Sequence, residues 1–183
     1  MNRAMSRPRK SRPPLERAQL ADLALHYAGR YMTTAKKLED YLRRKLRERG
    51  WGGEGEPPVA EIVAKCVDQR FVDDEAYASS KADALLRRGY GARRIAQALH
   101  HAGVSETIRD EQAPGEQDRR MAALALARRR RFGPFSRDAL DQALREKQVA
   151  AMMRAGHAPQ HARALVEARN EKEAEEWVAD CYD

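Results

Sequence analysis

The sequence predicts an all-α protein, built from tandem three-helix repeats that form an elongated, curved rod. Alanine occurs 32 times and arginine 27 times in the 183 residues, and both are strong helix formers. Valine, isoleucine and threonine together number only 14, too few for a substantial β-sheet. Apolar residues also recur at helical spacing, as in Leu38, Leu42 and Leu46.

The apolar stripes divide the chain into three units of short helices. We expect helices at 18–29, 34–49 and 58–69, then at 73–88, 92–102 and 105–112, and finally at 116–131, 138–155 and 159–169, with a tail helix at 171–180. The predicted organisation is a disordered basic arm at 1–17, a first repeat at 18–70, a second at 71–113, and a third at 114–183 that includes the tail helix.

Glycines punctuate these units at regular intervals. Gly50, Gly103 and Gly156 each follow a helical pattern, where glycine supplies a left-handed C-terminal cap, and they are separated by 53 residues each time. Helices this short are marginal alone, so each must pack on its neighbours. This spacing favours a row of repeated units over one large core.

The charge distribution is uneven. The formal net charge is +7, but five cations (Arg3, Arg7, Arg9, Lys10 and Arg12) and no acid lie in residues 1–15, which leaves 30 cations against 28 acids elsewhere. No apolar run approaches the roughly 18 residues that span a membrane. Cys66 and Cys181 are too few for a disulfide framework and suit a reducing cytoplasm as free thiols.

No catalytic or cofactor motif is present in the sequence. There is no P-loop, no dinucleotide-binding glycine pattern and no nucleophile elbow. His157 and His161 are four residues apart, as in some zinc helices, but no glutamate follows His157 and no third ligand is nearby. We therefore expect no enzyme activity, no metal and no cofactor.

Arginine clusters are the strongest functional signal. They recur at corresponding points of the three units, which favours a binding edge for a polyanion or an acidic protein groove over a set of merely solvated helix faces. Only Tyr90, Phe132 and Phe135 offer aromatic rings at these turns, so we expect little base readout. The candidate partner-binding residues are Arg43, Arg44, Arg47, Arg87, Arg88, Arg93, Arg94, Arg128, Arg129 and Arg130.

Two segments resemble a known family. FVDDEAYA, which begins at Phe71, and LRRGYGARRIAQAL, which begins at Leu86, are similar to the signature of the RecX family of recombination regulators. The resemblance extends more loosely from about Leu20 to Val166. The motif residues are Phe71, Asp73, Asp74, Glu75, Tyr77, Gly89, Tyr90, Gly91, Ile95 and Leu99.

The resemblance implies a partner that composition alone does not name. Such a protein would be a cytoplasmic monomer that binds the RecA recombinase filament on single-stranded DNA and acts in DNA repair, recombination and the SOS response. It would lie along the filament groove and inhibit ATP hydrolysis, strand exchange and co-protease activity. The alternative is a helical-repeat module that binds DNA directly and affects recombination secondarily.

Overall fold

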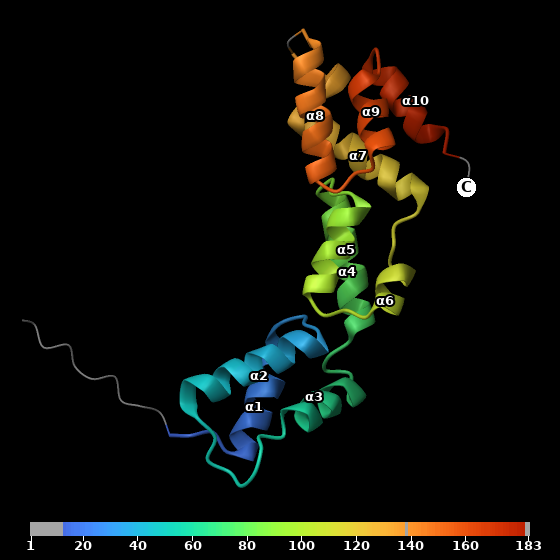
Figure 1. Ribbon diagram of the computed structural model, residues 1–183. Coiled ribbons are helices and arrows are strands. Elements are labelled where there is room, and N and C mark those ends of the chain that lie inside the picture. Colours follow the sequence, from blue (N-terminus) through green and yellow to red (C-terminus); the bar gives the residue numbers. More distant parts are fainter. Residues whose placement is uncertain (1–12, 138, 182–183) are drawn as a thin grey trace, which may run out of the picture. The chain divides into compact units, whose positions relative to one another are not determined.

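A computed structural model describes residues 13–137 and 139–181, and it confirms the all-α fold class (Figure 1). The described residues form ten α-helices and one short 3-10 turn, and their only β-type pairing is an isolated bridge between Leu15 and Trp51. The chain divides after Asp73 into two compact units, here called unit 1 and unit 2. The rod shape and the boundaries of the three repeats stay predictions.

From residue 13 on, unit 1 contains three helices around one core. They are α1 (Arg17–Arg30), α2 (Ala35–Arg49) and α3 (Val59–Asp68). The Thr34 hydroxyl accepts a hydrogen bond from the backbone N–H of Lys37 and so caps α2. The core includes Leu20, Leu38, Leu42, Ile62 and Cys66. Burial raises the pKa of the Cys66 thiol, which suits its predicted place in the core.

The start of unit 1 differs from the predicted basic arm. Residues 1–12 lie outside the described part, but Leu15 is completely buried and α1 begins at Arg17. The backbone N–H of Leu15 donates to the carbonyl of Gly50, and the N–H of Gly52 donates to the carbonyl of Leu15. An apolar side chain and two backbone bonds therefore fix a segment whose composition predicted disorder.

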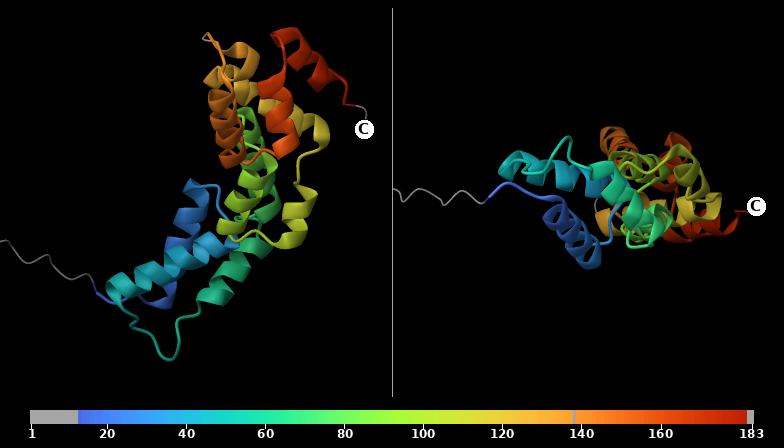
Figure 2. Two further views of the ribbon diagram at one scale, coloured as in Figure 1. Left: turned by 45° about the horizontal axis from the view of Figure 1, so that its top comes forward. Right: turned by 90° about the horizontal axis from the view of Figure 1, so that it is seen from below.

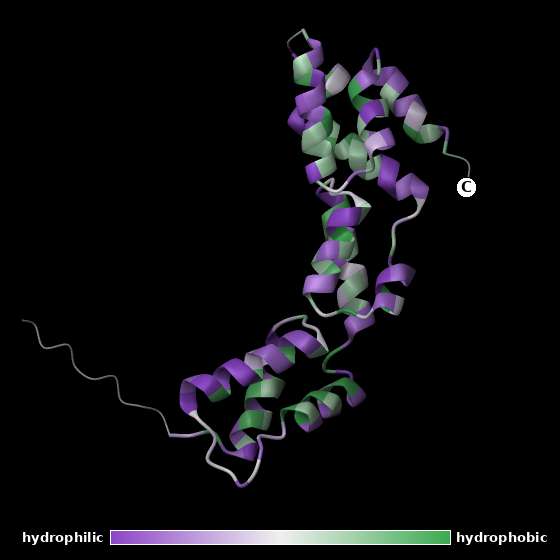
Figure 3. Cartoon of the chain, in the orientation of Figure 1, coloured by the Kyte–Doolittle hydropathy of each residue, from purple (hydrophilic) through white to green (hydrophobic). Residues whose placement is uncertain are grey.

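Unit 2 contains seven helices and two buried clusters. The helices are α4 (Asp74–Arg87), α5 (Ala92–His101), α6 (Glu106–Glu111), α7 (Glu116–Arg130), α8 (Gln142–Arg154), α9 (Pro159–Glu167) and α10 (Glu171–Ala179), with a 3-10 turn at Gly133–Phe135. One cluster contains Leu85, Ile95 and Leu99, and the other contains Met152 and Leu165. Hydrophobic and hydrophilic residues alternate along these helices, as Figure 3 shows.

The helices lie close to their predicted bounds. The largest shift is in α8, which was predicted from residue 138 and begins at Gln142. The Asp141 carboxylate accepts a hydrogen bond of 2.7 Å from the backbone N–H of Leu144 and caps the helix there. The predicted tail helix is present as α10, which packs against α7 and α9 (Figure 2).

A contact between two backbone turns joins α5 to α8 and α9. The turn at residues 89–91 lies against the turn at Gly156, and the N–H of Gly91 donates to the carbonyl of Ala155 at 3.0 Å. The N–H of Arg93 donates to the carbonyl of Gly156 at 3.2 Å. A Cβ atom on Gly91 would lie 2.3 Å from the carbonyl carbon of Gly156, so only glycine fits.

His157 completes this joint. Its Nε2 atom lies 3.0 Å from the carbonyl oxygen of Gly89, to which it donates a hydrogen bond, and the residue is buried. Burial is the largest influence on the imidazole and lowers its pKa below the ordinary value. The neutral ring is therefore the form that the joint holds.

Truncation of Leu99 tests the packing of the α4–α6 cluster. We expect Leu99→Ala to lower the free energy of unfolding by about 2–5 kcal/mol, because it deletes buried methyl groups and leaves a cavity. Urea denaturation followed by circular dichroism measures this change. His100→Ala, at an exposed position of the same helix, should change stability by less than about 0.5 kcal/mol. Equal effects of the two substitutions would contradict this packing.

A pair of glycine substitutions tests the joint. Gly91 and Gly115 are the N-cap residues of α5 and α7 and have similar backbone angles. Nothing lies within 4 Å of a Cβ on Gly115, whereas a Cβ on Gly91 meets the Gly156 backbone. We expect Gly91→Ala to destabilise the protein by about 1–3 kcal/mol or more, and Gly115→Ala to have little effect. Thermal unfolding of both variants measures the difference, and a neutral Gly91→Ala would contradict the contact.

The buried histidine predicts a pH dependence of stability. The unfolded chain takes up a proton at His157 near pH 6.5, whereas the native chain resists it to a lower pH. The free energy of unfolding should therefore fall as the pH drops through 6.5, by up to about 1.4 kcal/mol per pH unit. Urea denaturation between pH 7.5 and 5.5 should show this slope reduced in His157→Gln and kept in the exposed control His100→Gln. An unchanged slope in His157→Gln would show that another titrating group causes the pH dependence of stability.

Candidate functional site

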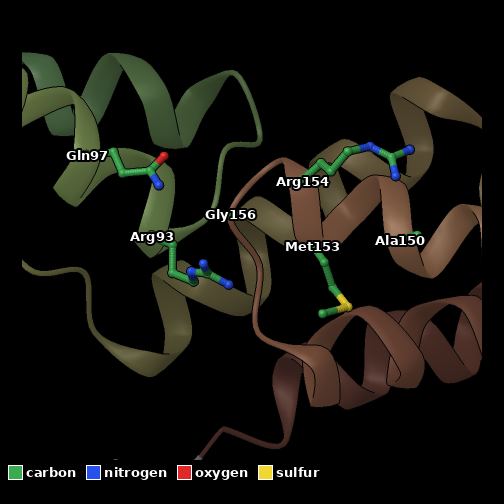
Figure 4. A pocket seen from close by; sticks show the side chains of 6 residues that line it. All are labelled: Arg93, Gln97, Ala150, Met153, Arg154 and Gly156. Atoms are coloured by element: carbon green, nitrogen blue, oxygen red, sulfur yellow. The ribbon is translucent and has the colours of Figure 1, made fainter.

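A hollow of about 450 Å³ lies beside the joint, between α5 and α8 (Figure 4). The backbone bonds of Gly91 and Arg93 to the α8–α9 turn bring the first turn of α5 next to the last turn of α8. Two arginines, one from each helix, border the hollow together with small and apolar groups. Its lining residues are Arg93, Gln97, Ala150, Met153, Arg154 and Gly156.

A second hollow, of about 370 Å³, lies nearer the N-terminal end of α8. The carboxamide oxygen of the buried Gln148 accepts a hydrogen bond of 2.8 Å from the N–H of Gly133, which ties the 3-10 turn to α8. Arg131 ends α7 in the left-handed conformation and turns the chain toward this hollow. The lining residues are Arg130, Arg131, Phe132, Ser136, Arg137, Leu144, Lys147, Gln148 and Ala151.

The two hollows share one basic surface. Lys147 and Arg154 are seven residues apart on α8, which is two helical turns, so both lie on the same side of the helix. Among the described residues, no aspartate or glutamate lines either hollow. We call this surface the α8 basic face, and define it by Arg93, Arg130, Arg131, Arg137, Lys147 and Arg154.

The cations of the α8 basic face lack acidic partners within the described part of the chain. The ion pairs found there include Arg120 with Glu116 and Arg163 with Glu167, but none contains a residue of this face. Uncompensated cations beside water raise the local positive potential and attract anions. The arrangement therefore suits an acidic partner surface or a phosphate backbone.

The predicted arginines of the 87–94 segment do not share one hollow. Arg93 lines the first hollow of the α8 basic face, whereas Arg87 borders a different hollow whose lining includes Asp83 and Asp118. Arg88 and Arg94 are exposed. Arg87 and Arg93 separate because Arg87 ends α4 whereas Arg93 lies in the first turn of α5. Arg93 and Arg94 differ because successive residues of a helix point in directions about 100° apart.

The predicted arginines at the end of α7 also differ among themselves. Arg130 lines the second hollow, and Arg129 is exposed. Arg128 forms an ion pair with Glu175 of α10, and its guanidinium lies 5.6 Å from the ring centroid of Phe135. Arg128 therefore contacts the tail helix, a role that a run of four arginines does not reveal.

The predicted arginines of unit 1 lie on α2. Arg43 pairs with Glu39 at 2.7 Å, and Arg44 lies 3.9 Å from Glu48, each one helical turn away. Arg47 is exposed and has no ion pair among the described residues. Pairs of this exposed kind contribute little to stability, so the arginines stay available to a partner.

Most of the family-motif residues are structural. Tyr77, Ile95 and Leu99 belong to the buried cluster of α4–α6. Gly89, Tyr90 and Gly91 form the joint turn or pack beside it. Asp74 and Glu75 lie in the first turn of α4, where negative charge is favourable, and Asp73 lies 3.8 Å from Arg70. Phe71 differs from the others because half of its surface is exposed.

The two histidines of α9 and its preceding turn have structural partners. His161 is buried, and its Nε2 atom lies 2.9 Å from Oε1 of Glu116, which also accepts a hydrogen bond from Arg120. Chiefly through Arg120, these neighbours lower the pKa of the Glu116 carboxyl. Arg120 also donates to the carbonyl of Trp177 and so holds α10. Among the described residues, no group of three possible metal ligands is present.

The sequence reasoning missed a cluster of three tyrosines in unit 1. Tyr27, Tyr31 and Tyr41 lie together at a further hollow with several cations. Two signals were available: Tyr27 on the predicted helix 18–29 with Tyr31 four residues later, just past its end, and the basic residues around Tyr41.

Comparisons with known proteins agree on one family. A family model described as "RecX, second three-helix domain" matches residues 73–111. The Regulatory protein RecX of Myxococcus xanthus (strain DK1622) is 35% identical over 163 residues, which cover 84% of this chain and 85% of the relative. That of Agrobacterium fabrum (strain C58) is 31% identical over 161 residues and 86% of each chain.

Solved structures show the same fold. RecX from Lactobacillus salivarius superposes with a TM-score of 0.64 at 20% identity and covers 82% of this chain and 94% of its own. No helix in the described part of the chain has the length and apolar character to cross a membrane. The sequence identity over most of both chains, together with the matched second three-helix domain, shows that this protein belongs to the RecX family of regulatory proteins.

Proposed function

We propose that this protein is a non-enzymatic modulator of RecA. It binds the RecA filament on single-stranded DNA along its groove and inhibits ATP hydrolysis, strand exchange and co-protease activity. Family membership supports the choice of partner. The observation that carries the mechanism is the α8 basic face, because it combines two open hollows with six cations that have no acidic partner among residues 13–137 and 139–181.

The surface suits a large partner better than a small substrate. Both hollows are open, and small or apolar groups such as Ala150 and Met153 lie between the cations. Met153 is partly exposed, so a partner that covers it would remove apolar area from water. The arginines would then steer the encounter and set its orientation, while the apolar contacts would lengthen its lifetime.

The mechanism follows from where the cations are fixed. Arg93 is held to the α8–α9 turn by its own backbone N–H, so it keeps a constant position relative to Arg154. Because the backbones that carry these two arginines are already fixed, a partner does not have to order the helix ends before it contacts both side chains. In this proposal a monomer in the cytoplasm occupies filament surface that nucleotide turnover and strand pairing require. Arg43, Arg44, Arg47, Arg88 and Arg94 are further proposed contacts.

Charge reversal on the α8 basic face tests the proposal. The double variant Arg93→Glu/Arg154→Glu should require at least about tenfold more protein for half-inhibition of RecA ATP hydrolysis and strand exchange, which corresponds to about 1.4 kcal/mol. The matched control is Arg163→Glu/Arg169→Glu, which makes the same charge change at exposed arginines outside this face. Circular dichroism and thermal unfolding confirm that both variants fold.

Two outcomes would count against the proposal. Full inhibition by Arg93→Glu/Arg154→Glu would show that the α8 basic face does not take part in the mechanism. Absence of inhibition by the wild type at every ratio would show that the protein does not modulate RecA. Binding to RecA without DNA, set beside binding to DNA without RecA, separates the proposal from the alternative of a direct DNA-binding module. In that alternative, inhibition follows DNA affinity and falls steeply as salt rises.

A further inference from the structure

A hollow of about 380 Å³ on unit 1 is lined by aromatic rings and cations together. It lies between the C-terminal half of α1 and the middle of α2, far from the described joint in sequence. Its size is within the range of ordinary ligand sites. The lining residues are His26, Tyr27, Arg30, Tyr31, Tyr41, Arg44 and Lys45.

The three rings have different roles. Tyr27 and Tyr41 stack on each other with centroids 4.2 Å apart and an angle of 16°, and both are partly buried. The ring of Tyr31 lies 5.3 Å from that of Tyr27, and about half of the residue's surface is exposed. Tyr27 and Tyr41 therefore form a rigid support, and Tyr31 offers an aromatic surface to a ligand.

Cations surround the rings. The guanidinium of Arg30 lies 5.7 Å from the centroid of Tyr31, and that of Arg44 lies 5.4 Å from the centroid of Tyr41. Lys45 lies 5.8 Å from the Tyr41 ring and pairs with Glu48, which also lies 3.9 Å from Arg44. Within the described part of the chain, Arg30 has no ion pair and no acid lines the hollow. The hollow therefore combines an uncompensated positive charge with the exposed aromatic ring of Tyr31.

This combination fits one class of ligand. A base of single-stranded nucleic acid presents a free π-face for stacking and has a phosphate on either side, whereas the bases of a duplex are covered by their neighbours. An acidic peptide would satisfy the cations but would leave the exposed ring unused. We propose that the tyrosine hollow of unit 1 binds single-stranded nucleic acid, with a base stacked on Tyr31 and adjoining phosphates on Arg30 and Arg44.

The test of this site does not depend on RecA, although Arg44 is also one of the proposed contacts of the modulator. All of its residues belong to unit 1, and none belongs to the α8 basic face. The experiment therefore uses the full chain without RecA, so that failure of the RecA proposal does not affect it. The probes are a fluorescently labelled oligothymidylate, an abasic oligomer of the same length, and a blunt duplex.

Substitution of Tyr31 separates stacking from charge. Stacking of a base on an aromatic side chain contributes about 1–3 kcal/mol, so Tyr31→Leu should weaken oligothymidylate binding by roughly 5- to 150-fold. Its affinity for the abasic oligomer should not change. Tyr31→Trp should keep oligothymidylate binding, because indole also stacks. Met32→Ala is the matched control, since it removes an exposed apolar side chain at the next position and should have no effect.

The cations give a second readout. Arg30→Gln should weaken binding of oligothymidylate and of the abasic oligomer alike, and it should reduce the slope of log affinity against log salt by about 0.7. Lys36→Gln is the control, because Lys36 lies outside the hollow and is paired with Asp40. A smaller slope only in Arg30→Gln supports a phosphate contact there.

Three results would overturn the proposal: equal binding of the oligothymidylate and abasic probes to the wild type, an equal loss on both probes in Tyr31→Leu, or preferred binding of the duplex. Circular dichroism checks that Tyr31→Leu folds. If it does not fold, the fluorescence of Tyr31→Trp decides, after subtraction of the wild-type signal of Trp51 and Trp177. Quenching by oligothymidylate and not by the abasic oligomer supports stacking, and no quenching contradicts it.

Discussion

The close approach of Gly91 to Gly156 is the contact on which unit 2 depends. Two backbone hydrogen bonds and the His157–Gly89 bond join turns that are more than sixty residues apart in the sequence. A side chain on either glycine would separate them. Because α5 and α8 are short, neither has enough buried surface to find its position alone, and the joint determines where their exposed residues lie.

The electrostatic character of the surface follows from this backbone contact. Arg93 lies in the first turn of α5 and Arg154 ends α8, so the joint that aligns these helix ends also places both side chains at one hollow. Several arginines elsewhere in the described chain are compensated, as Arg128 is by Glu175 and Arg43 by Glu39, whereas others such as Arg47 are not. The ability of a surface to attract an anionic partner therefore depends on which cations have no neighbouring acid. The net charge of the whole chain does not describe this.

Helices and cores could be predicted because they depend on local periodicity. Leu38 and Leu42, or Ile95 and Leu99, are four residues apart, and both pairs are buried as their stripes indicate. The site could be predicted only in part, since a pairing such as Arg128 with Glu175 joins residues 47 apart. Leu15 was assigned to a basic arm because charged residues lie near it in the sequence. In the structure its own apolar side chain is completely buried.

The residues that reveal the family and those that contact a partner are largely different sets. Gly89, Gly91, Ile95 and Leu99 identify the chain, yet they form the joint and the cluster behind it. Arg93 is next to them and is exposed. A change at the glycines would displace Arg93 relative to Arg154, so a loss of binding there would indicate altered geometry and not a lost contact. Only exposed positions, such as Arg93 and Arg154 themselves, can report the contact with a partner directly.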